Sequence, residues 1–453
     1  MASKKELVEA QAFSRRRLLT AFVSGAPGGR ELEPTKPLRA VVAGVALSVL
    51  LVLGSLGFGL LKPGLPTGWD DGSLVLTQGS GTRFVALEGT LYPVTNTTSA
   101  RLLIPSDEFT VVEVPADTIA EVPRGAQVGI AGAPDELPAR ENLVADGWVS
   151  CTADGDAIRT EVTPGSAGAT ASESSAVVTS GKQTYVLHGA YRYLVAPGQS
   201  TAILRALGLE SAEIVAVPGL WLNTFTPGSA LEPLTLRGAG APLDGPLETV
   251  GAVVGSVLVV AETGGTPKRY VVTTDDELAP LTEVAFQLYQ LGSGSALAGP
   301  ITVTSAEIRD LETTTALAPQ TWPVEPSPAL ADGAPLCVTL DGSASPAASG
   351  RLADAPEDAA PSRSGLEVVV APARGALVRG TGDQVPDRGT VQLLDGSGTT
   401  FAVPDSSTEV LAQLGYTTAD IVPVPQAWLS LFPAGPELTV EAASQTPQVA
   451  SAP

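Results

Sequence analysis

The sequence predicts an α+β protein with a single N-terminal transmembrane helix, followed by an elongated extracytoplasmic domain. That domain contains four β-hairpin/helix/strand repeats around a central β-rich core closed by one disulfide. Three observations lead to this prediction: an apolar run covers residues 40–61, a segment near residue 200 recurs near residue 410, and both cysteines follow the run. The 48 glycines and 38 prolines among 453 residues also favour short strands and turns.

The apolar run contains no charged side chain. At the helical rise of 1.5 Å per residue it is about 33 Å long, which is enough to cross the hydrocarbon core of a bilayer. A secretory signal peptide has a shorter apolar region nearer the N-terminus and a small-residue cleavage site after it. Here Lys62-Pro63-Gly64 follows the run. We therefore expect an uncleaved transmembrane helix at 40–61.

Charge is distributed unequally around this helix. Residues 1–39 carry eight basic and four acidic side chains, whereas the whole chain has a formal net charge of −22. Because lysine and arginine favour the cytoplasmic side of a membrane, the sequence predicts a cytoplasmic N-terminus and an acidic outer domain. The acidic balance also argues against a nucleic-acid partner, since phosphate would be repelled.

The outer domain contains internal repeats. Residues 201–228 (TAILRALGLESAEIVAVPGLWLNTFTPG) align without gaps with residues 408–435 (TEVLAQLGYTTADIVPVPQAWLSLFPAG), so that Trp221 matches Trp428. Each stretch predicts a short helix, a strand ended by proline and an aromatic-bearing turn. Two further copies are indicated by the Val-x-Val-Pro run at 112–115 and, more weakly, by residues 264–303. Such repeats should dock on one another or on a central body.

These observations divide the chain into segments. The expected boundaries are 1–39 for a cytoplasmic basic helix and linker, 40–61 for the transmembrane helix, 62–125 for the first repeat, 126–176 for the first part of the core, 177–240 for the second repeat, 245–312 for the third repeat, 313–385 for the second part of the core, 386–443 for the fourth repeat and 444–453 for a disordered tail. The stretches 163–176 and 341–365 are rich in small and polar residues and are expected to be mobile loops.

Cys151 and Cys337 both follow the transmembrane helix, in a compartment where disulfides persist. We expect them to pair and to close a loop of about 190 residues, which stabilises the fold by at most about 5 kcal/mol in the chain-entropy model. The alternative is two unrelated buried thiols. Trp148, three residues before Cys151, is interpreted as a core aromatic that packs near the disulfide.

The sequence contains no recognisable catalytic constellation. The nucleotide-binding pattern G-x-x-x-x-G-K-[ST] and the serine-hydrolase pattern G-x-S-x-G are both absent. His188 is the only histidine and is interpreted as a turn residue rather than a general base. The acidic groups at 154–156 and 275–277 lack EF-hand spacing and are interpreted as solvated turns. We therefore predict no catalytic residue, no cofactor and no metal site.

Two features indicate contact surfaces. Ala40, Gly44 and Ser48 recur every four residues in the apolar run, a spacing that lets another helix approach closely. Residues 4–23 combine apolar pairs with three consecutive arginines at 15–17. This second pattern predicts either a basic helix that lies on anionic lipid or a docking helix for a cytosolic partner.

Several motifs point to one family. The stretch 91–102 reads LYPVTNTTSARL, and shorter motifs at 133–138, 148–151 and 335–338 accompany it, the last two around the cysteines. Together with the N-terminal region, these motifs resemble EccB, a membrane component of type VII (ESX) secretion systems. The residues that carry the resemblance are Pro93, Val94, Asn96, Ser99, Ala100, Arg101 and Leu102 in the central motif, and Phe13, Arg16, Arg17 and Phe22 in the N-terminal region.

The resemblance implies a non-catalytic structural scaffold subunit of a type VII secretion membrane complex in a Gram-positive bacterium. The implied partners are an FtsK/SpoIIIE-type ATPase, a polytopic channel-like subunit, a second bitopic subunit and a subtilisin-like membrane protease, together with homo-oligomeric contacts. Phe13, Arg16, Arg17 and Phe22 are the implied cytosolic docking residues. The implied location is the cell membrane, crossed once, with the C-terminal domain extracytoplasmic.

Two other functions remain open. The repeats resemble the wall-binding domains of phage lysins, so the outer domain is also interpreted as a cell-wall (peptidoglycan) anchor. An ATP hydrolase is the third interpretation, because that activity has been proposed for the family, although the chain lacks a Walker A lysine.

Overall fold

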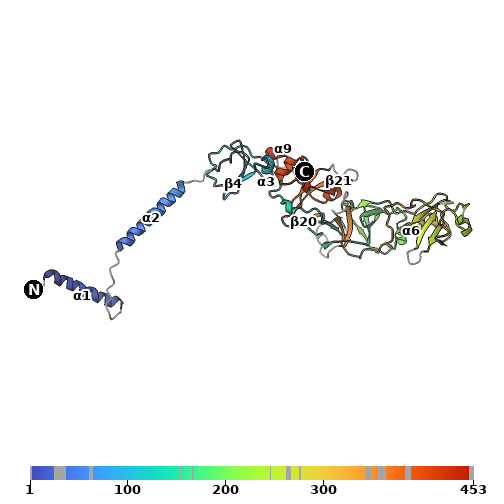
Figure 1. Cartoon of the computed structure of the whole chain (residues 1–453), viewed down its shortest axis with the longest axis horizontal. Helices are drawn as coiled ribbons and strands as arrows, with labels where there is room; N and C mark the ends of the chain where they lie inside the picture. The colour runs from blue at the N-terminus through green and yellow to red at the C-terminus, as the bar shows by residue number, and fades with distance from the viewer. Residues whose placement is uncertain are drawn as a thin grey trace. The chain divides into compact units, whose positions relative to one another are not determined.

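The computed structural model (Figure 1) contains two compact units, residues 1–65 and residues 66–453. It describes residues 3–24, 37–60, 65–153, 155–165, 168–244, 246–261, 267–274, 277–341, 349–354, 359, 364–382 and 389–447. Part of the expected tail, residues 448–453, lies outside the described residues. So do Asp154, Asp275 and Asp276 of the two acidic groups.

The first unit consists of two helices, α1 (Lys4–Ser24) and α2 (Pro37–Leu60). The window Leu38–Ser55 of α2 is long and apolar enough to cross a membrane. The two serine side chains of this window are satisfied within the helix, because the Ser48 hydroxyl donates to the Gly44 carbonyl (2.8 Å) and the Ser55 hydroxyl to the Val52 carbonyl (2.9 Å). Internal satisfaction of polar groups is what a helix in hydrocarbon requires.

The second unit contains four sheets with one common plan. Three successive strands pair antiparallel, a helix follows, and a further strand returns parallel to the first strand at the edge of the sheet. The sequence predicted only a hairpin, a helix and a strand for each repeat. The third antiparallel strand is a correction, which arises because the chain turns twice before it enters the helix.

The elements of the first two repeats have these bounds. The first contains β1 (Ser73–Thr77), β2 (Arg83–Leu87), β3 (Thr90–Pro93), α3 (Thr97–Leu103) and β4 (Thr110–Val114). The second contains β8 (Ser175–Ser180), β9 (Gln183–His188), β10 (Tyr191–Leu194), α4 (Ser200–Ala206), β11 (Ile214–Ala216), α5 (Gly219–Leu222) and β12 (Thr226–Pro227).

The third and fourth repeats follow the same order. The third contains β13 (Val257–Val260), β14 (Lys268–Val272), β15 (Glu277–Leu281), α6 (Glu283–Leu291), β16 (Ile301–Val303) and β17 (Glu312–Thr313). The fourth contains β21 (Ala376–Thr381), β22 (Val391–Leu394), β23 (Thr400–Val403), α7 (Thr408–Leu414), β24 (Val422–Pro425), α8 (Gln426–Leu429) and α9 (Val440–Ser444). The fourth sheet thus begins at β21, ten residues before the boundary expected at 386, because β21 pairs with β22 and β24.

A fifth sheet forms the centre, with strand order β20-β6-β5-β18-β19-β7. Its strands are β5 (Trp148–Thr152), β6 (Ile158–Val162), β7 (Thr170–Ala171), β18 (Leu336–Asp341), β19 (Ser349–Asp354) and β20 (Leu366–Val370). The strands β7 and β19 correct part of the expectation of loops at 163–176 and 341–365; residues 166–167, 342–348, 355–358 and 360–363 of these stretches lie outside the described residues.

The small residues of β19 have a packing role. A Cβ atom at Gly350 would lie 2.6 Å from the Thr224 carbonyl oxygen and 2.7 Å from a methyl group of Val338. The position therefore requires glycine because another backbone approaches closely, which is one of the reasons for glycine within a strand. Composition alone did not distinguish this close contact from a flexible loop.

Repeats 2 and 4 pack against the central sheet. Trp148 of the sheet shares one hydrophobic cluster with Trp221 of repeat 2 and Trp428 of repeat 4, and all three rings are fully buried. Repeat 1 contacts repeat 4 through α3, which lies beside α9 (Figure 1) and also touches α7. Repeat 3 contacts repeat 2 through α6 and α4. Repeats 2 and 4 are therefore the inner repeats, and the outer repeats 1 and 3 dock on repeats 4 and 2, respectively.

The match between Trp221 and Trp428 extends to their local structure. Each lies in a four-residue helix whose N-cap is a proline, α5 after Pro218 and α8 after Pro425. The expected aromatic-bearing turn is therefore a short helix. The partners differ, because the Trp221 indole donates to the Ser150 carbonyl (3.0 Å), whereas Trp428 Nε1 has no hydrogen-bond partner among the described residues.

Three corresponding glycines leave room for an aromatic ring. A Cβ atom on each glycine would overlap the ring, and the pairs are Gly125 with Tyr92, Gly228 with Tyr193 and Gly435 with Phe401. Each glycine N–H donates to the carbonyl of the residue before the aromatic one. In repeat 3 this bond runs from Thr314 to Leu278, and Ala279 takes the aromatic position. In repeat 3, therefore, both the aromatic residue and the glycine opposite it are replaced, by Ala279 and Thr314.

We predict that Gly228→Ala lowers the free energy of unfolding by about 1–3 kcal/mol, the usual effect of overpacking a well-filled site. The added methyl would lie 2.5 Å from the Tyr193 ring, which is itself held by a hydrogen bond from its hydroxyl to the Thr321 carbonyl. Urea denaturation of the full chain measures the change. The matched control is Thr314→Ala, where no ring opposes the side chain, and an equal loss in the control would contradict this account.

Candidate functional site

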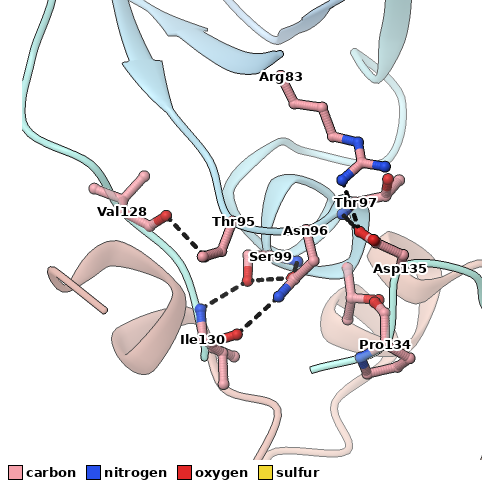
Figure 2. A network of polar contacts seen from close by, with 10 residues as sticks. Arg83, Thr95, Asn96, Thr97, Ser99, Val128, Ile130, Pro134 and Asp135 are labelled. Atoms are coloured by element: carbon pink, nitrogen blue, oxygen red, sulfur yellow. Dashed lines mark hydrogen bonds and ion pairs between the residues drawn. The ribbon is translucent and has the colours of Figure 1, made fainter. Parts of the chain in front are cut away.

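The motif at 93–102 surrounds the N-terminus of α3 (Figure 2). Asn96 is the N-cap residue: its Oδ1 accepts from the Ser99 N–H (2.9 Å) and from the Ser99 hydroxyl (2.6 Å). Its Nδ2 donates to the Ile130 carbonyl (2.7 Å), and the Ile130 N–H donates to Ser99 Oγ (2.9 Å). Asn96 and Ser99 are buried, so these bonds replace those that water would make.

A second group of bonds lies on the neighbouring side of the same helix end. The Thr98 hydroxyl donates to the Pro134 carbonyl (2.5 Å). Figure 2 shows Asp135, which accepts from the Thr97 N–H (3.3 Å) and from Arg83 (3.0 Å). The Arg83–Asp135 pair is largely exposed, so it contributes little to stability. The buried bonds are the ones that fasten residues 128–135 to repeat 1.

The remaining motif residues have packing roles. Pro93 accepts the Val128 N–H (2.9 Å), and Val94 forms a parallel bridge with Val128. Ala100 and Leu102 are fully buried, and Leu102 belongs to a hydrophobic cluster built mainly from repeat 4. The Arg101 guanidinium lies 4.8 Å from the centre of the Phe109 ring. The whole motif therefore forms the junction of repeat 1, the segment after it and repeat 4.

Cys151 and Cys337 are bonded, as expected. They face each other across the antiparallel strands β5 and β18, with their Cα atoms 4.1 Å apart, and both are buried. The disulfide covalently joins the two parts of the core across 186 residues of sequence. Trp148 packs on the opposite face of the sheet, which corrects the expectation that it lies against the disulfide. Side chains alternate along β5, so residues three apart point to opposite faces.

His188 is the last residue of β9 and lies where repeat 2 meets the segment before β18. Its Nδ1 is within hydrogen-bond distance of the hydroxyl oxygens of Ser175 (3.3 Å) and Ser327 (3.2 Å). Burial lowers the pKa of His188 below its usual 6.5 and Arg351 acts in the same direction, while Glu173 and a hydrogen bond with the Ser174 backbone oppose the shift. His188 therefore helps to join repeat 2 to the segment before β18 through hydrogen bonds.

The lowered pKa of His188 predicts that acid weakens the fold. Above pH 6.5 the ring is neutral in both folded and unfolded chains; as the pH falls below 6.5 the unfolded chain takes up the proton first, so stability declines. We expect His188→Gln to flatten the pH dependence of the free energy of unfolding between pH 7.5 and 5.5. Parallel denaturation curves for both proteins provide the measurement, and identical pH dependence would refute the prediction.

The described residues hold no group of three or more His, Cys, Asp or Glu side chains that could bind a metal ion. The two best-defined cavities in the described part have volumes of about 20 and 190 Å³. Typical small-molecule sites are larger, at about 300–1,000 Å³. The larger cavity lies beside the Arg140–Asp420 ion pair, where several hydrogen bonds and Arg140 hold the pKa of the Asp420 carboxyl below its usual value despite its partial desolvation.

The proposed docking residues lie on α1. The side chains of Phe13 and Phe22 are 58% and 93% exposed, and Arg16 and Arg17 are exposed beside them. Five other large apolar side chains of this helix are also mostly exposed, namely Leu7, Val8, Leu18, Leu19 and Val23. So much exposed apolar surface on one helix is typical of a contact site.

Sequence reasoning missed several residues that join the repeats. The Tyr416 hydroxyl donates to the Pro138 carbonyl (2.7 Å), and burial raises the pKa of Tyr416. The Trp322 indole similarly donates to the Ala230 carbonyl (3.0 Å). The two segments that precede the core strands are thus held to the inner repeats. No local sequence pattern predicts these two hydrogen bonds, because the bonded residues are 278 and 92 positions apart in the sequence.

Together, the candidate membrane helix, the four repeat sheets and the disulfide-closed core define a membrane-anchored repeat protein. The chain belongs to the EccB family: residues 1–451 match the family model described as "Type VII secretion system ESX-1, transport TM domain B". This match confirms the family that the sequence motifs indicated.

Named relatives agree with this assignment. The chain is 28% identical over 448 residues to the ESX-2 secretion system ATPase EccB2 of Mycobacterium tuberculosis, covering 89% of this chain and 88% of the relative. It is 27% identical over 438 residues to the ESX-3 secretion system ATPase EccB3 of Mycolicibacterium smegmatis, covering 88% and 82%.

Two solved structures share the fold. One is described as an intact ESX-5 inner membrane complex: a chain of it aligns with a TM-score of 0.65 and 22% identity, covering 100% of this chain and 98% of that chain. The other is an EccB3 dimer from the ESX-3 core complex, with a TM-score of 0.66, 22% identity and coverage of 82% and 99%.

Proposed function

We propose that this chain is a non-catalytic structural scaffold subunit of the inner-membrane complex of a type VII (ESX) secretion system. Family membership and the fold shared with a chain of the ESX-5 inner membrane complex support this proposal. The observation that carries it is the use of the family motif. Asn96 and Ser99 are buried and bonded within the junction of repeats, as a structural motif requires and a reactive site does not.

The proposed topology follows from charge and hydropathy. The candidate span in α2 is preceded by a basic segment and followed by the acidic outer domain. By the preference of basic residues for the cytoplasmic side, the N-terminus is cytoplasmic and residues 62–453 are extracytoplasmic. Attaching a thiol-reactive, membrane-impermeant probe to a cysteine introduced at exposed Thr302 tests this orientation in intact cells.

The proposed cytosolic contact is α1, with Phe13, Arg16, Arg17 and Phe22 as docking residues. Its partners would be the FtsK/SpoIIIE-type ATPase, the polytopic channel-like subunit, the second bitopic subunit and the subtilisin-like protease. We expect Phe13→Ser with Phe22→Ser to reduce secretion, because both rings are exposed in the chain alone and are free to enter a partner. The control pair Leu366→Ser and Val324→Ser changes exposed residues of the outer domain. Equal secretion by both double variants would contradict the docking role.

The names of the relatives, which call them ATPases, favour a second candidate, an ATP hydrolase. The sequence lacks the lysine-bearing phosphate loop that such enzymes commonly use. The two candidates are separated by assaying ATP hydrolysis of the purified full chain across fractions of a sizing column. Activity that follows the protein peak and survives a second, orthogonal purification would support the hydrolase and overturn the non-catalytic scaffold.

A further inference from the structure

In every repeat the strand that follows the helix after the three antiparallel strands lies at an edge of its sheet. These edge strands are β4, β11, β16 and β24, each paired on one side with the first strand of its repeat. The other side of an edge strand presents backbone N–H and C=O groups that can pair with another chain. Proteins usually block such edges, often with proline.

The outward-facing residues follow from the ladder. The Gln78 N–H donates to the Val114 carbonyl (2.9 Å), so Val114 faces β1. Because successive residues of a strand point their backbone groups to opposite sides, Val112 also faces β1, whereas Val111 and Glu113 face outward. The corresponding outward positions, from the registers of the other parallel pairs, are 214 and 216 in repeat 2, 300 and 302 in repeat 3, and 421 and 423 in repeat 4.

One of the two outward positions is blocked in repeats 2 and 3, and both are blocked in repeat 4. In repeat 2 the Ala216 carbonyl accepts the Gly155 N–H of the core (3.1 Å). In repeat 3 the first outward position is Pro300, which has no N–H. In repeat 4 the Ile421 N–H donates to the Thr418 carbonyl, and the second outward position is Pro423.

The edge of repeat 1 has no such block. Neither Val111 nor Glu113 is a proline, and no described residue hydrogen-bonds to their backbone groups. Val111 is also 56% exposed, among the most exposed large apolar side chains of the outer domain. The strand β4, with five residues, is also the longest of the four edge strands.

We propose that β4 pairs antiparallel with β4 of a second copy of this chain, about a two-fold axis at Val112. This inference rests on the proposed scaffold function and adds to it a contact between two copies of this chain. In this register Val111 of each copy lies opposite Glu113 of the other and exchanges two hydrogen bonds with it, while the two Val112 residues face each other as a non-hydrogen-bonded pair. The contact is isologous and closes at two copies.

The charge of β4 selects both the partner and the direction. Glu113 is the only charged residue of the strand, and the antiparallel register places it opposite Val111. An in-register parallel pair would place the two Glu113 carboxylates side by side, where like charges repel. The segment Thr110-Val111-Val112-Glu113-Val114 is therefore self-complementary in the antiparallel direction. Because the whole chain is acidic, we also expect moderate salt to strengthen the contact by screening.

Cysteine cross-linking of the full chain in membranes tests the register. Val112→Cys places two thiols across antiparallel strands, the relation that Cys151 and Cys337 have within this chain. Both native cysteines are already bonded, so the introduced thiol is the only free one. Under copper-phenanthroline oxidation we expect a disulfide-linked dimer. Ile301→Cys, at the corresponding position of the blocked edge in repeat 3, is the matched control and should give no comparable dimer.

A second substitution tests the backbone pairing. Glu113→Pro turns Val112-Glu113-Val114-Pro115 into Val-Pro-Val-Pro, the sequence of β24, so the repeat tolerates it. The change removes one intermolecular N–H per copy, and we expect the cross-linked fraction of Val112→Cys to fall about tenfold. Glu113→Gln removes the charge but keeps the N–H, so this variant should still cross-link.

The outcomes are distinct. A strong Val112→Cys dimer that Glu113→Pro abolishes and Glu113→Gln preserves supports the proposal. The proposal is overturned if Val112→Cys gives no dimer, or if Glu113→Pro leaves the dimer unchanged. It is also overturned if no dimer forms while the other subunits protect the Val112→Cys thiol from alkylation. The last result would leave the scaffold proposal intact, because it would show a different subunit on this edge.

Discussion

Removing the disulfide with Cys151→Ala and Cys337→Ala is expected to lower the free energy of unfolding by about 2–5 kcal/mol, the range typical of a native bond that closes a long loop. The bond spans 186 residues of sequence and joins neighbouring strands at the centre of the core sheet. Repeats 2 and 4 both pack on that sheet, so their docking should weaken with it. The melting temperature of the full chain measures the loss.

Reduction provides the matched control. The wild-type chain in excess reductant should melt near the temperature of the double variant once the buried bond is opened, and the double variant itself should not respond to reductant. Both sulfur atoms belong to buried cysteines, so reduction should require partial unfolding or heat. A double variant as stable as the oxidised wild type would contradict the assigned role of the bond.

The substitution Asn96→Ala is expected to cost about 2–4 kcal/mol. It removes the N-cap of α3, which is usually worth about 1 kcal/mol. It also leaves the Ile130 carbonyl and the Ser99 N–H without their partners in a buried site, and each unsatisfied group costs about 1–3 kcal/mol. Because these bonds hold residues 128–135, the contact between repeats 1 and 4 should loosen as well.

The control for this prediction is Ser407→Ala, at the N-cap of the corresponding helix α7. Ser407 accepts only the Val410 N–H (3.4 Å) and lies at the surface, so its loss should cost about 1 kcal/mol or less. Urea denaturation of both variants gives the comparison. Equal losses would show that Asn96 acts as a simple helix cap and does not join the repeats.

Much of the fold could be predicted because its signals are local. The candidate membrane helix follows from one apolar run, and the repeats follow from the gap-free match that aligns Trp221 with Trp428. The close contact of Gly350 could not be predicted, since a glycine that meets another backbone has the same composition as a loop glycine. The face on which Trp148 packs was wrongly predicted because proximity in sequence was taken for proximity in space, against the alternation of the strand.

The candidate site was partly predictable. The motif residues Asn96 and Ser99 were identified by resemblance, but their role depends on Ile130, more than 30 residues later. The disulfide could be predicted because the chain has only two cysteines. The features that block pairing at three of the four edge strands β4, β11, β16 and β24 could be recognised only once the outward-facing positions of these strands were known. Pro300 directly precedes β16, whereas Pro423 lies within β24, and the two share no sequence pattern.

The central claim is that the N-terminal unit assembles the secretion complex while the outer domain is structural. The most direct test is to delete residues 3–24, keep α2, and purify the tagged chain from membranes with quantitative mass spectrometry of the co-purifying subunits. The exposed apolar and basic side chains of α1 would be lost, so the account predicts a large fall in the ATPase and channel-like subunits relative to the full chain. Co-purification of the full set of subunits at wild-type ratios would contradict it.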